Sequence, residues 1–365
     1  MMLDVPSRGP VWDLPLRLFH WSLLLAVLTA AVSGFLLPLN WLNLHLIAGT
    51  AIIVLLFFRL VWGFTGSSFS RFSSFVFSPS TVLAHARALR KGETPFHAGH
   101  NPVGSVMIFA LLGMLTLLTV TGVIVLGGAD KQGVLRALIS YATGSSLRQI
   151  HEILAYGLLA LVLGHVAGVI FESRRSGINL ARSMVTGDKP LPEPLAIAPP
   201  RIGAALVGLS MTMLVAGYAA FALWRLPTTD VPQNALDAAY EKQCGDCHIP
   251  FHPSLRGRGA WTAIMTTLDD HFGEDASLPA DELARLSDYL TLNAAERWDT
   301  RAANVFRDAE PLRITDTIFW KRRHADIDPA QFQTKKVGAK SNCEACHGDA
   351  RTGLFSAQAI NIPQE

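Results

Sequence analysis

All four cysteines of the 365-residue sequence lie in two copies of one short motif, C-x-x-C-H. The motif residues are Cys244, Cys247 and His248 in the first copy and Cys343, Cys346 and His347 in the second. Two thiols at this spacing can form thioethers with the vinyl groups of one porphyrin, and the adjacent histidine can then ligate its iron. A single copy could be a redox pair, but two copies with no other cysteine predict two haem c groups.

Two further histidines, His151 and His165, lie on one apolar run at 147–171 that is long enough to span a bilayer. They are fourteen residues apart, which is about 21 Å along a helix and brings both to nearly the same face. Ionisable side chains inside a membrane span are costly, so they indicate a functional site. The alternative is a pair of histidines hydrogen-bonded to neighbouring helices, but the spacing suits two stacked haem b groups better.

Five apolar segments in residues 1–225 have the length of membrane-spanning helices. They are expected at about 19–39, 41–62, 103–126, 148–171 and 202–224. The first is longer than the apolar region of a typical signal peptide, so we expect it to be retained. Eleven Lys and Arg lie in the N-terminal tail and in the loops after the second and fourth segments, whereas the opposite loops hold three. The positive-inside rule then predicts a cytoplasmic N-terminus and places the segment after the fifth span outside.

This topology sorts the membrane histidines by depth. His20 and His165 are expected near the cytoplasmic surface. His45 and His151 are expected near the outer surface. Each pair could hold the iron of one haem b from both faces. Arg17, three residues before His20, could pair with a propionate of the inner haem, although basic residues at this surface also follow from topology alone.

The segment at 226–365 has no run long enough to cross a membrane, and two of its remaining histidines are expected to be distal iron ligands. The expected pairs are His248 with His271 for the first haem c, and His347 with His324 for the second. Which distal histidine serves which haem is not decided by spacing alone. Met265 is the alternative ligand, because Met/His ligation also occurs in c-type cytochromes. His252, four residues after His248, is not expected to reach the far side of the same haem.

Charge divides the chain at the same place. Residues 1–225 hold 16 Lys and Arg against 8 Asp and Glu, a net charge of +8, and residues 226–365 hold 15 against 21, a net charge of −6. The basic residues of the first part lie in loops between apolar segments, so nothing indicates nucleic-acid binding. The acidic second part would favour a partner with a basic face.

Residues 10–190 resemble the bacterial cytochrome b561 family, which includes the cytochrome b subunits of nickel-iron hydrogenases. The marks are Val11-Trp12-Asp13 with Arg17 and His20-Trp21, then His45, Gly99-His100-Asn101-Pro102, His151 and His165. The resemblance implies a four-helix bundle with two b haems and quinone chemistry.

Residues 235–360 resemble the small dihaem cytochrome c proteins. The marks are the stretches 270–278, 312–315 and 342–347. That family implies two bis-histidine haems, which supports His271 and His324 as ligands. The fifth apolar segment fits neither family and is expected to connect the two parts.

The sequence therefore predicts an all-α protein in three parts. Residues 1–190 would form a transmembrane four-helix dihaem b bundle, 191–225 a linker with a fifth connecting transmembrane helix, and 226–365 a small, mostly helical, periplasmic dihaem cytochrome c domain. We expect a multi-pass protein of the bacterial inner membrane. It would pass electrons between the quinone pool and a soluble periplasmic redox protein or cytochrome, at most as a quinol:cytochrome c-type oxidoreductase.

Two alternatives stay open at this point. One is an electron-transfer subunit of a larger membrane oxidoreductase, such as a hydrogenase. The other is an enzyme that reduces a small oxidant at an open haem, but the eight paired histidines suffice for four six-coordinate irons, which argues against it. The direction of electron flow does not follow from the sequence, and a homodimer is a further hypothesis.

Overall fold

The computed structural model describes residues 7–93, 95–191, 196–233 and 235–363. Residues 192–195 of the predicted linker and Asn234 lie outside the described residues. The described chain is mostly helical and has one two-stranded sheet, which confirms the predicted all-α class. It divides into two compact units.

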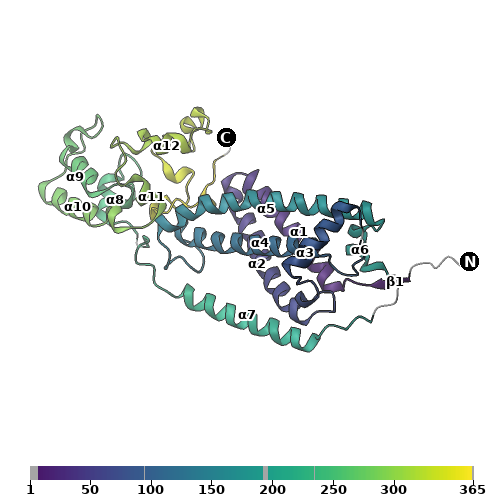
Figure 1. Ribbon diagram of the computed structural model, residues 1–365. Helices are drawn as coiled ribbons and strands as arrows, with labels where there is room; N and C mark the ends of the chain where they lie inside the picture. The colour runs from purple at the N-terminus through teal and green to yellow at the C-terminus, as the bar shows by residue number, and fades with distance from the viewer. Residues whose placement is uncertain (1–6, 94, 192–195, 234, 364–365) are drawn as a thin grey trace, which may run out of the picture. The chain divides into compact units, whose positions relative to one another are not determined.

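Five helices of the described chain are long and apolar enough to cross a membrane, as predicted. They are α1 Leu14–Phe35, α2 Leu42–Thr65, α4 Pro102–Gly128, α5 Tyr141–Ser176 and α7 Ile202–Trp224 (Figure 1). Many of their large apolar side chains are exposed, as expected for surfaces that face lipid.

Helix α1 begins five residues before the predicted start of the first span because Asp13 caps it. The Asp13 carboxylate accepts the N–H of Leu16 at 2.9 Å. Pro15 occupies the first turn, where its missing N–H leaves no hydrogen bond unmade. The helix ends at Phe35, earlier than predicted, and Pro38 follows shortly after.

Helix α5 has 36 residues and extends beyond the predicted span at both ends. At about 1.5 Å per residue it is about 54 Å long, which exceeds the hydrocarbon core of a bilayer at about 30 Å. Arg174 and Arg175 lie in its last turn, where positive charge complements the helix dipole.

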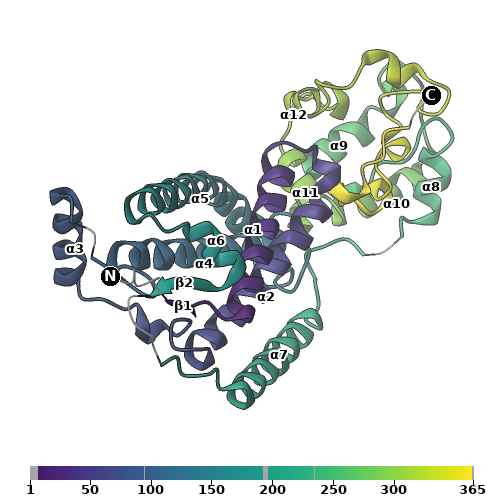
Figure 2. The same ribbon diagram turned by 90° about the vertical axis from the view of Figure 1, so that its right-hand side faces the viewer.

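The first unit comprises Met1–Leu37, Leu44–Gly122 and Gln149–Ala222. Its core lies between α1, α2, α4 and α5 and is built from Ala26, Ile52, Leu115, Leu118 and Leu158. Helix α7 lies beside α2, since a Cβ at Gly208 would be 3.0 Å from Cγ1 of Val61. Strands β1 (Ser7–Pro10) and β2 (Asp188–Leu191) pair antiparallel, as Figure 2 shows.

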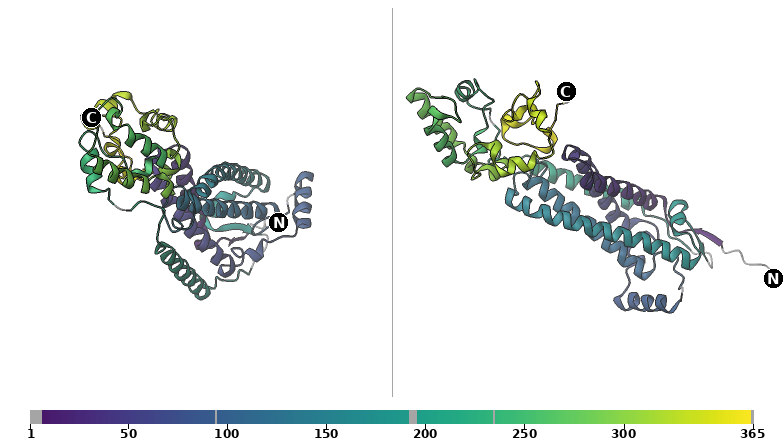
Figure 3. Two further views of the ribbon diagram at one scale, coloured as in Figure 1. Left: turned by 90° about the vertical axis from the view of Figure 1, so that its left-hand side faces the viewer. Right: turned by 90° about the horizontal axis from the view of Figure 1, so that it is seen from above.

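Two short helices complete the first unit, α3 (Pro79–Lys91) and α6 (Leu180–Thr186). Helix α3 projects from the bundle (Figures 2 and 3). It carries His85 and begins after Ser78, which caps the helix and accepts the N–H of Thr81.

The second unit comprises Pro38–Asn43, Val123–Arg148 and Leu223–Glu365. The turn between α1 and α2 and the loop between α4 and α5 therefore pack with the C-terminal domain, by which we mean the described residues of 226–365. That turn is the 3-10 helix η1 (Leu39–Trp41). The helices of the C-terminal domain are α8 Ala238–Cys244, α9 Arg258–Thr266, α10 Ala280–Leu292, α11 Arg301–Phe306 and α12 Ile318–Arg323.

The C-terminal domain has a core between α8, α9 and α10. Leu286 and Leu290 of α10 are each 1% exposed and pack with Tyr240 and Trp261. The remaining chain consists mainly of 3-10 turns, and both C-x-x-C-H motifs lie at such irregular segments or at a helix end. A domain of this size with so little regular core relies on other groups to fill it.

Candidate haem sites

The two histidines expected near the outer surface face one another. The ring centres of His45 on α2 and His151 on α5 lie 6.3 Å apart. Nδ1 of His45 is 3.0 Å from the carbonyl oxygen of Ala30. A carbonyl can only accept, so Nδ1 carries the proton and Nε2 of His45 holds the lone pair that a metal needs.

His151 has the same tautomer for a related reason. Its Nδ1 lies 3.0 Å from the hydroxyl oxygen of Thr121, and that hydroxyl lies 2.9 Å from the carbonyl oxygen of Leu117. The hydroxyl has one proton and gives it to the carbonyl, so it accepts from Nδ1–H of His151. Glycines make room for both rings: a Cβ at Gly34 or at Gly122 would lie 3.2 Å from Cε1 of His45 or of His151, respectively.

The inner pair consists of His20 on α1 and His165 on α5. The two imidazoles lie close enough for their charges to interact. Nδ1 of His20 is buried without a hydrogen-bond partner among the described residues. A buried polar atom without a partner costs about 1–3 kcal/mol, so this site fits completion by a bound group.

The first motif of the C-terminal domain brings His248 opposite His271. Their ring centres are 6.2 Å apart and the ring planes lie 16° from parallel. Nδ1–H of His248 donates to the carbonyl of Ile249 at 2.8 Å, which again leaves Nε2 with the lone pair. Burial, followed by repulsion from His248 and Arg313, lowers the pKa of His271 and so favours the neutral, ligating imidazole.

The second motif brings His347 opposite His324, with ring centres 6.2 Å apart. Nδ1–H of His324 donates to the carbonyl of Trp320 at 2.9 Å, and the indole of Trp320 stacks on the imidazole at 4.3 Å. Nδ1 of His347 is buried without a partner among the described residues. Burial and the neighbouring His324 lower the pKa of His347, which also favours the neutral ring.

The separations of these pairs fit an iron between two imidazoles. With metal–nitrogen bonds of about 2 Å, the two ring centres lie about 6 Å apart. Three of the four predicted pairs have ring centres at 6.2 or 6.3 Å. The outer b site and both c sites can therefore offer two imidazoles to a haem iron, and each c site can add two thiols for the vinyl groups.

Met265, the alternative ligand, and His252, which was not expected to be a ligand, have different surroundings. Met265 is 5% exposed and belongs to the apolar core around Leu286. Nδ1 of His252 accepts the N–H of Ser254 at 3.1 Å, so its proton is on Nε2, the reverse of the tautomer of His248. Burial lowers the pKa of His252 to about 4.

Arg17 was predicted to pair with a haem propionate. It lies on α1 one turn before His20, and its Nε is buried without a partner among the described residues. A Cβ at Gly187 would lie 2.8 Å from Nη1 of Arg17, so the guanidinium packs against this turn.

A polar cluster beside the inner pair was missed by the sequence analysis. Its members are Asp13, Arg59, His100 and Lys189. His100 packs against Trp12 at 4.6 Å between ring centres, and its Nδ1 is buried without a partner among the described residues. Burial, followed by the charges of Arg59 and Lys189, lowers the pKa of His100 to about 3.

Arg59 and Lys189 are held by main-chain oxygens. Arg59 is 3% exposed and donates to the carbonyl of Ser70 at 3.1 Å. Nζ of Lys189 donates to the carbonyls of His97, Ala98 and Gly99 at 3.0–3.3 Å. The signals in the sequence were Arg59, a charged residue within an apolar segment, and the family marks Asp13 and His100.

Comparison with known proteins matches two families. Residues 11–187 match the family model of prokaryotic cytochrome b561, and residues 240–355 match that of dihaem cytochrome c. The probable Ni/Fe-hydrogenase B-type cytochrome subunit of Rhodobacter capsulatus is 22% identical over 210 residues, which cover 49% of this chain and 80% of that protein. The probable Ni/Fe-hydrogenase 1 B-type cytochrome subunit of Escherichia coli K12 is 24% identical over 208 residues, which cover 48% and 88%.

Solved structures similar to the C-terminal part are dihaem cytochromes. DHC from Rhodobacter sphaeroides is 35% identical, with 34% of this chain and 100% of that chain covered and a TM-score of 0.27. The dihaem cytochrome c of Shewanella baltica OS155 is 32% identical, with 34% and 92% covered and a TM-score of 0.28. Residues 11–187 thus form a prokaryotic cytochrome b561 domain and residues 240–355 a dihaem cytochrome c domain, and the chain is a fusion of the two.

Proposed function

We propose that this protein carries electrons across the membrane between the quinone pool and a soluble periplasmic redox protein, using two b haems and two c haems. When bound, the haem irons supply one-electron redox chemistry. His20 with His165 and His45 with His151 would hold the b irons. His248 with His271 and His347 with His324 would hold the c irons, with thioethers to the four cysteines.

The observation that carries this proposal is the repeated separation of 6.2–6.3 Å between imidazole centres in three pairs. Four histidines of these pairs have the proton on Nδ1, fixed by an oxygen acceptor: His45, His151, His248 and His324. Such oriented neutral rings are what bis-histidine ligation requires, and they leave no open coordination position for a small oxidant.

The orientation is part of the proposal. The excess of Lys and Arg in alternate loops supports a cytoplasmic N-terminus, and five spans then place the C-terminal domain in the periplasm. The net charge of −6 on residues 226–365 supports a soluble partner with a basic face.

We place the quinone reaction beside the inner pair. Oxidation of a quinol releases two electrons and two protons, and the anion that forms on proton loss needs hydrogen bonds and positive charge. His100 offers a neutral imidazole close to His165, and Arg59 and Lys189 supply positive charge next to it. Burying charged and polar side chains in a membrane protein is costly, so such a cluster indicates a function, and binding the quinone would be that function.

The haem content tests the first part of the proposal. A pyridine haemochrome assay on the purified protein should give equal amounts of b and c haem. Mixing the oxidised protein with a soluble quinol analogue should then reduce both kinds of haem, and a basic c-type cytochrome added afterwards should be reduced in turn. A c haem without any b haem, or b haems that dithionite reduces but no quinol does, would contradict it.

The quinone placement has its own test. Replacement His100→Ala should slow quinol-driven b-haem reduction while leaving the dithionite-reducible haem content unchanged. The matched control is His97→Ala in the same loop, because the ring of His97 packs on His85 instead of the cluster. Equal rates in both variants would place the quinone elsewhere.

A second candidate is a dedicated electron-transfer subunit of a larger complex. Its support is that the similar B-type cytochromes are named as subunits of Ni/Fe hydrogenases. This candidate predicts co-purification with a catalytic subunit and no quinol oxidation by the isolated chain.

A further inference from the structure

The loop between α4 and α5 is fixed to the C-terminal domain by a buried lysine. The side chain of Lys131 is 2% exposed, and its Nζ donates to Asp299 at 2.7 Å and to Asp230 at 2.9 Å. It also donates to the carbonyl of Ile139 at 3.1 Å. A buried ammonium group needs such oxygens in place of the water that it loses. The backbone of Lys131 has φ 52°, a strained conformation for a side-chain-bearing residue.

Two further ion pairs and a helix cap reinforce this attachment. Asp130 accepts from Arg301 at 2.7 Å and from Arg148 at 3.2 Å. Asp299 also accepts the N–H of Tyr141, the first residue of α5, where a negative charge complements the helix dipole. Residues 130–148 thus contact 230 and 299–301 through charged groups on both sides.

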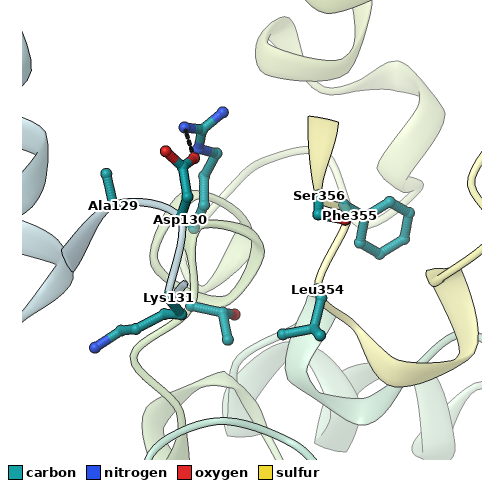
Figure 4. A pocket seen from close by; sticks show the side chains of 8 residues that line it. Ala129, Asp130, Lys131, Leu354, Phe355 and Ser356 are labelled. Atoms are coloured by element: carbon teal, nitrogen blue, oxygen red, sulfur yellow. Dashed lines mark hydrogen bonds and ion pairs between the residues drawn. The ribbon is translucent and has the colours of Figure 1, made fainter. Parts of the chain in front are cut away.

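The segment 354–356, which follows the second haem motif in the chain, lies against the same loop. Figure 4 shows Asp130 and Lys131 on one side of a small recess and Leu354, Phe355 and Ser356 on the other. The ring of Phe355 is 5.2 Å from that of His347.

Hydrogen bonds join the segment 356–361 to the second haem motif and the residues that follow it. Asp349, two residues after His347, accepts the hydroxyl of Ser356 at 2.6 Å. Gly348 N–H donates to Ala359 at 3.0 Å, and Asn361 N–H donates to Cys346 at 2.8 Å.

The far side of this segment meets the loops that lead into the membrane helices. Gln358 and Gln132 exchange two amide hydrogen bonds of 3.0 Å. The 3-10 turn η10 (Ala357–Ala359) packs on η1 between α1 and α2. Along the chain, His45 follows the second-unit segment Pro38–Asn43 by two residues, and His151 follows Val123–Arg148 by three. Both proposed outer ligands are therefore two or three residues along the chain from segments that contact η10, which lies beyond the second motif.

The first motif has different neighbours. Gln243, just before Cys244, donates to Glu282 at 2.7 Å, and Tyr240 donates to the carbonyl of Phe251 at 2.7 Å. Arg351 connects the motifs, because it pairs with Glu241 at 2.6 Å and with Glu344, next to Cys343.

We infer that electrons enter the C-terminal domain from the membrane helices at the His324/His347 site. They leave for the soluble partner at the His248/His271 site. Lys131 is the positioning residue that keeps the two sites in this order. The inference rests on the proposed electron route between membrane and periplasm. It adds to that route the order in which electrons pass through the two c sites, and it names the residue that attaches the C-terminal domain to the loop between α4 and α5. The direction of electron flow can reverse without changing this order of the two c sites.

The first test needs no electron flow. A Gln132→Cys/Gln358→Cys variant should be bridged by a short bis-maleimide reagent, because side chains that meet at their amide ends hold the backbones further apart than a disulfide spans. Mass spectrometry of a digest detects the bridge. The control, Gln132→Cys/Gln243→Cys, places the second thiol beside the first motif and should not cross-link. Cross-linking of the control pair, or of neither pair, overturns the docking arrangement whether or not quinol is the reductant.

The second test removes one c site at a time. Without the second site (Cys343→Ala/Cys346→Ala), quinol should still reduce the b haems, but reduction of the remaining c haem should fall by at least tenfold. Without the first site (Cys244→Ala/Cys247→Ala), reduction of the remaining c haem should keep the wild-type rate. The opposite pattern overturns the order of the sites. Failure of quinol to reduce any b haem in the wild-type protein contradicts the proposed function and leaves the cross-linking result standing.

The third test addresses Lys131. Replacement Lys131→Met should slow b-to-c electron transfer about tenfold, which corresponds to about 1.4 kcal/mol of lost docking free energy. The b-haem reduction rate and the c-haem midpoint potentials should stay unchanged, and Lys131→Arg should restore part of the rate. The matched control is Lys335→Met, at an exposed lysine of the same domain. Altered c-haem potentials, or an unchanged rate, would show that Lys131 does not position the sites.

Discussion

The imidazoles of His248 and His271 lie 6.2 Å apart and 16° from parallel, although twenty-three residues separate them in the chain. Helix α9 and the 3-10 turn η4 (Leu268–Asp270) return the chain to bring His271 opposite the motif. Phe272, the residue after His271, has φ 58°, a backbone conformation that is uncommon for a residue other than glycine.

Replacement His271→Ala should separate covalent attachment from ligation. The thioethers to Cys244 and Cys247 do not involve His271, so the haem should stay bound and stain in a denaturing gel. The iron should lose its sixth ligand, which makes it high-spin and able to bind carbon monoxide. Absorption spectra with and without carbon monoxide measure this, and an unchanged low-spin spectrum would mean that another residue is the ligand.

Replacement His165→Ala should remove the inner b haem, because a haem held only by two imidazoles needs both. The b-haem content should fall by half while both c haems stay attached, as measured by the pyridine haemochrome assay. His85→Ala is the control, since His85 lies on α3, outside all four pairs. Equal loss of all haems from the His165 variant would contradict separate sites.

His252 should make the C-terminal domain less stable in acid. Burial lowers its pKa to about 4, whereas the unfolded chain has a pKa of about 6.5. Between these values the unfolded state binds the extra proton, so the free energy of unfolding falls as pH drops from about 6.5 to 4, by up to about 3 kcal/mol. Above this window the group contributes no pH dependence.

Replacement His252→Asn should flatten this part of the profile, because an amide oxygen can still accept the N–H of Ser254 without titrating. Thermal unfolding followed at several pH values by haem circular dichroism compares the two proteins. Parallel pH profiles would contradict the assignment to His252.

Arg256 should be a main determinant of the stability of the C-terminal domain. Its side chain is 1% exposed and donates to the carbonyls of Ala309 and Pro311, each at 2.7 Å. Arg256→Met leaves these oxygens buried without donors and should destabilise the domain by roughly 3 kcal/mol. The exposed neighbour Arg258→Met is the control and should leave the unfolding midpoint within about 0.5 kcal/mol of wild type.

The sequence was sufficient to predict the all-α class, the number of membrane-spanning helices and the two families that the chain combines. Apolar run length predicts spans because a bilayer imposes one length on every helix that crosses it. The span ends were less accurate: Asp13 extends α1 at its start, and α5 continues past both predicted limits. Such ends depend on single capping residues and on polar turns beyond the hydrocarbon core.

The contacts between distant residues were not predictable. Lys131 was counted only as one of three positive residues in the outer loops, yet its partners Asp230 and Asp299 lie 99 and 168 residues away. No periodic pattern links such positions. The same holds for His100, whose environment is set by Trp12, Arg59 and Lys189 from three separate segments.

Helix α5 carries His151 and His165, and under the proposed ligation it supplies one imidazole to each membrane iron. A small rotation or axial shift of this helix would therefore change the ligand field at both irons at the same time. Their midpoint potentials are then mechanically linked, so a mutation in the bundle that tilts α5 would retune the pair together instead of one alone.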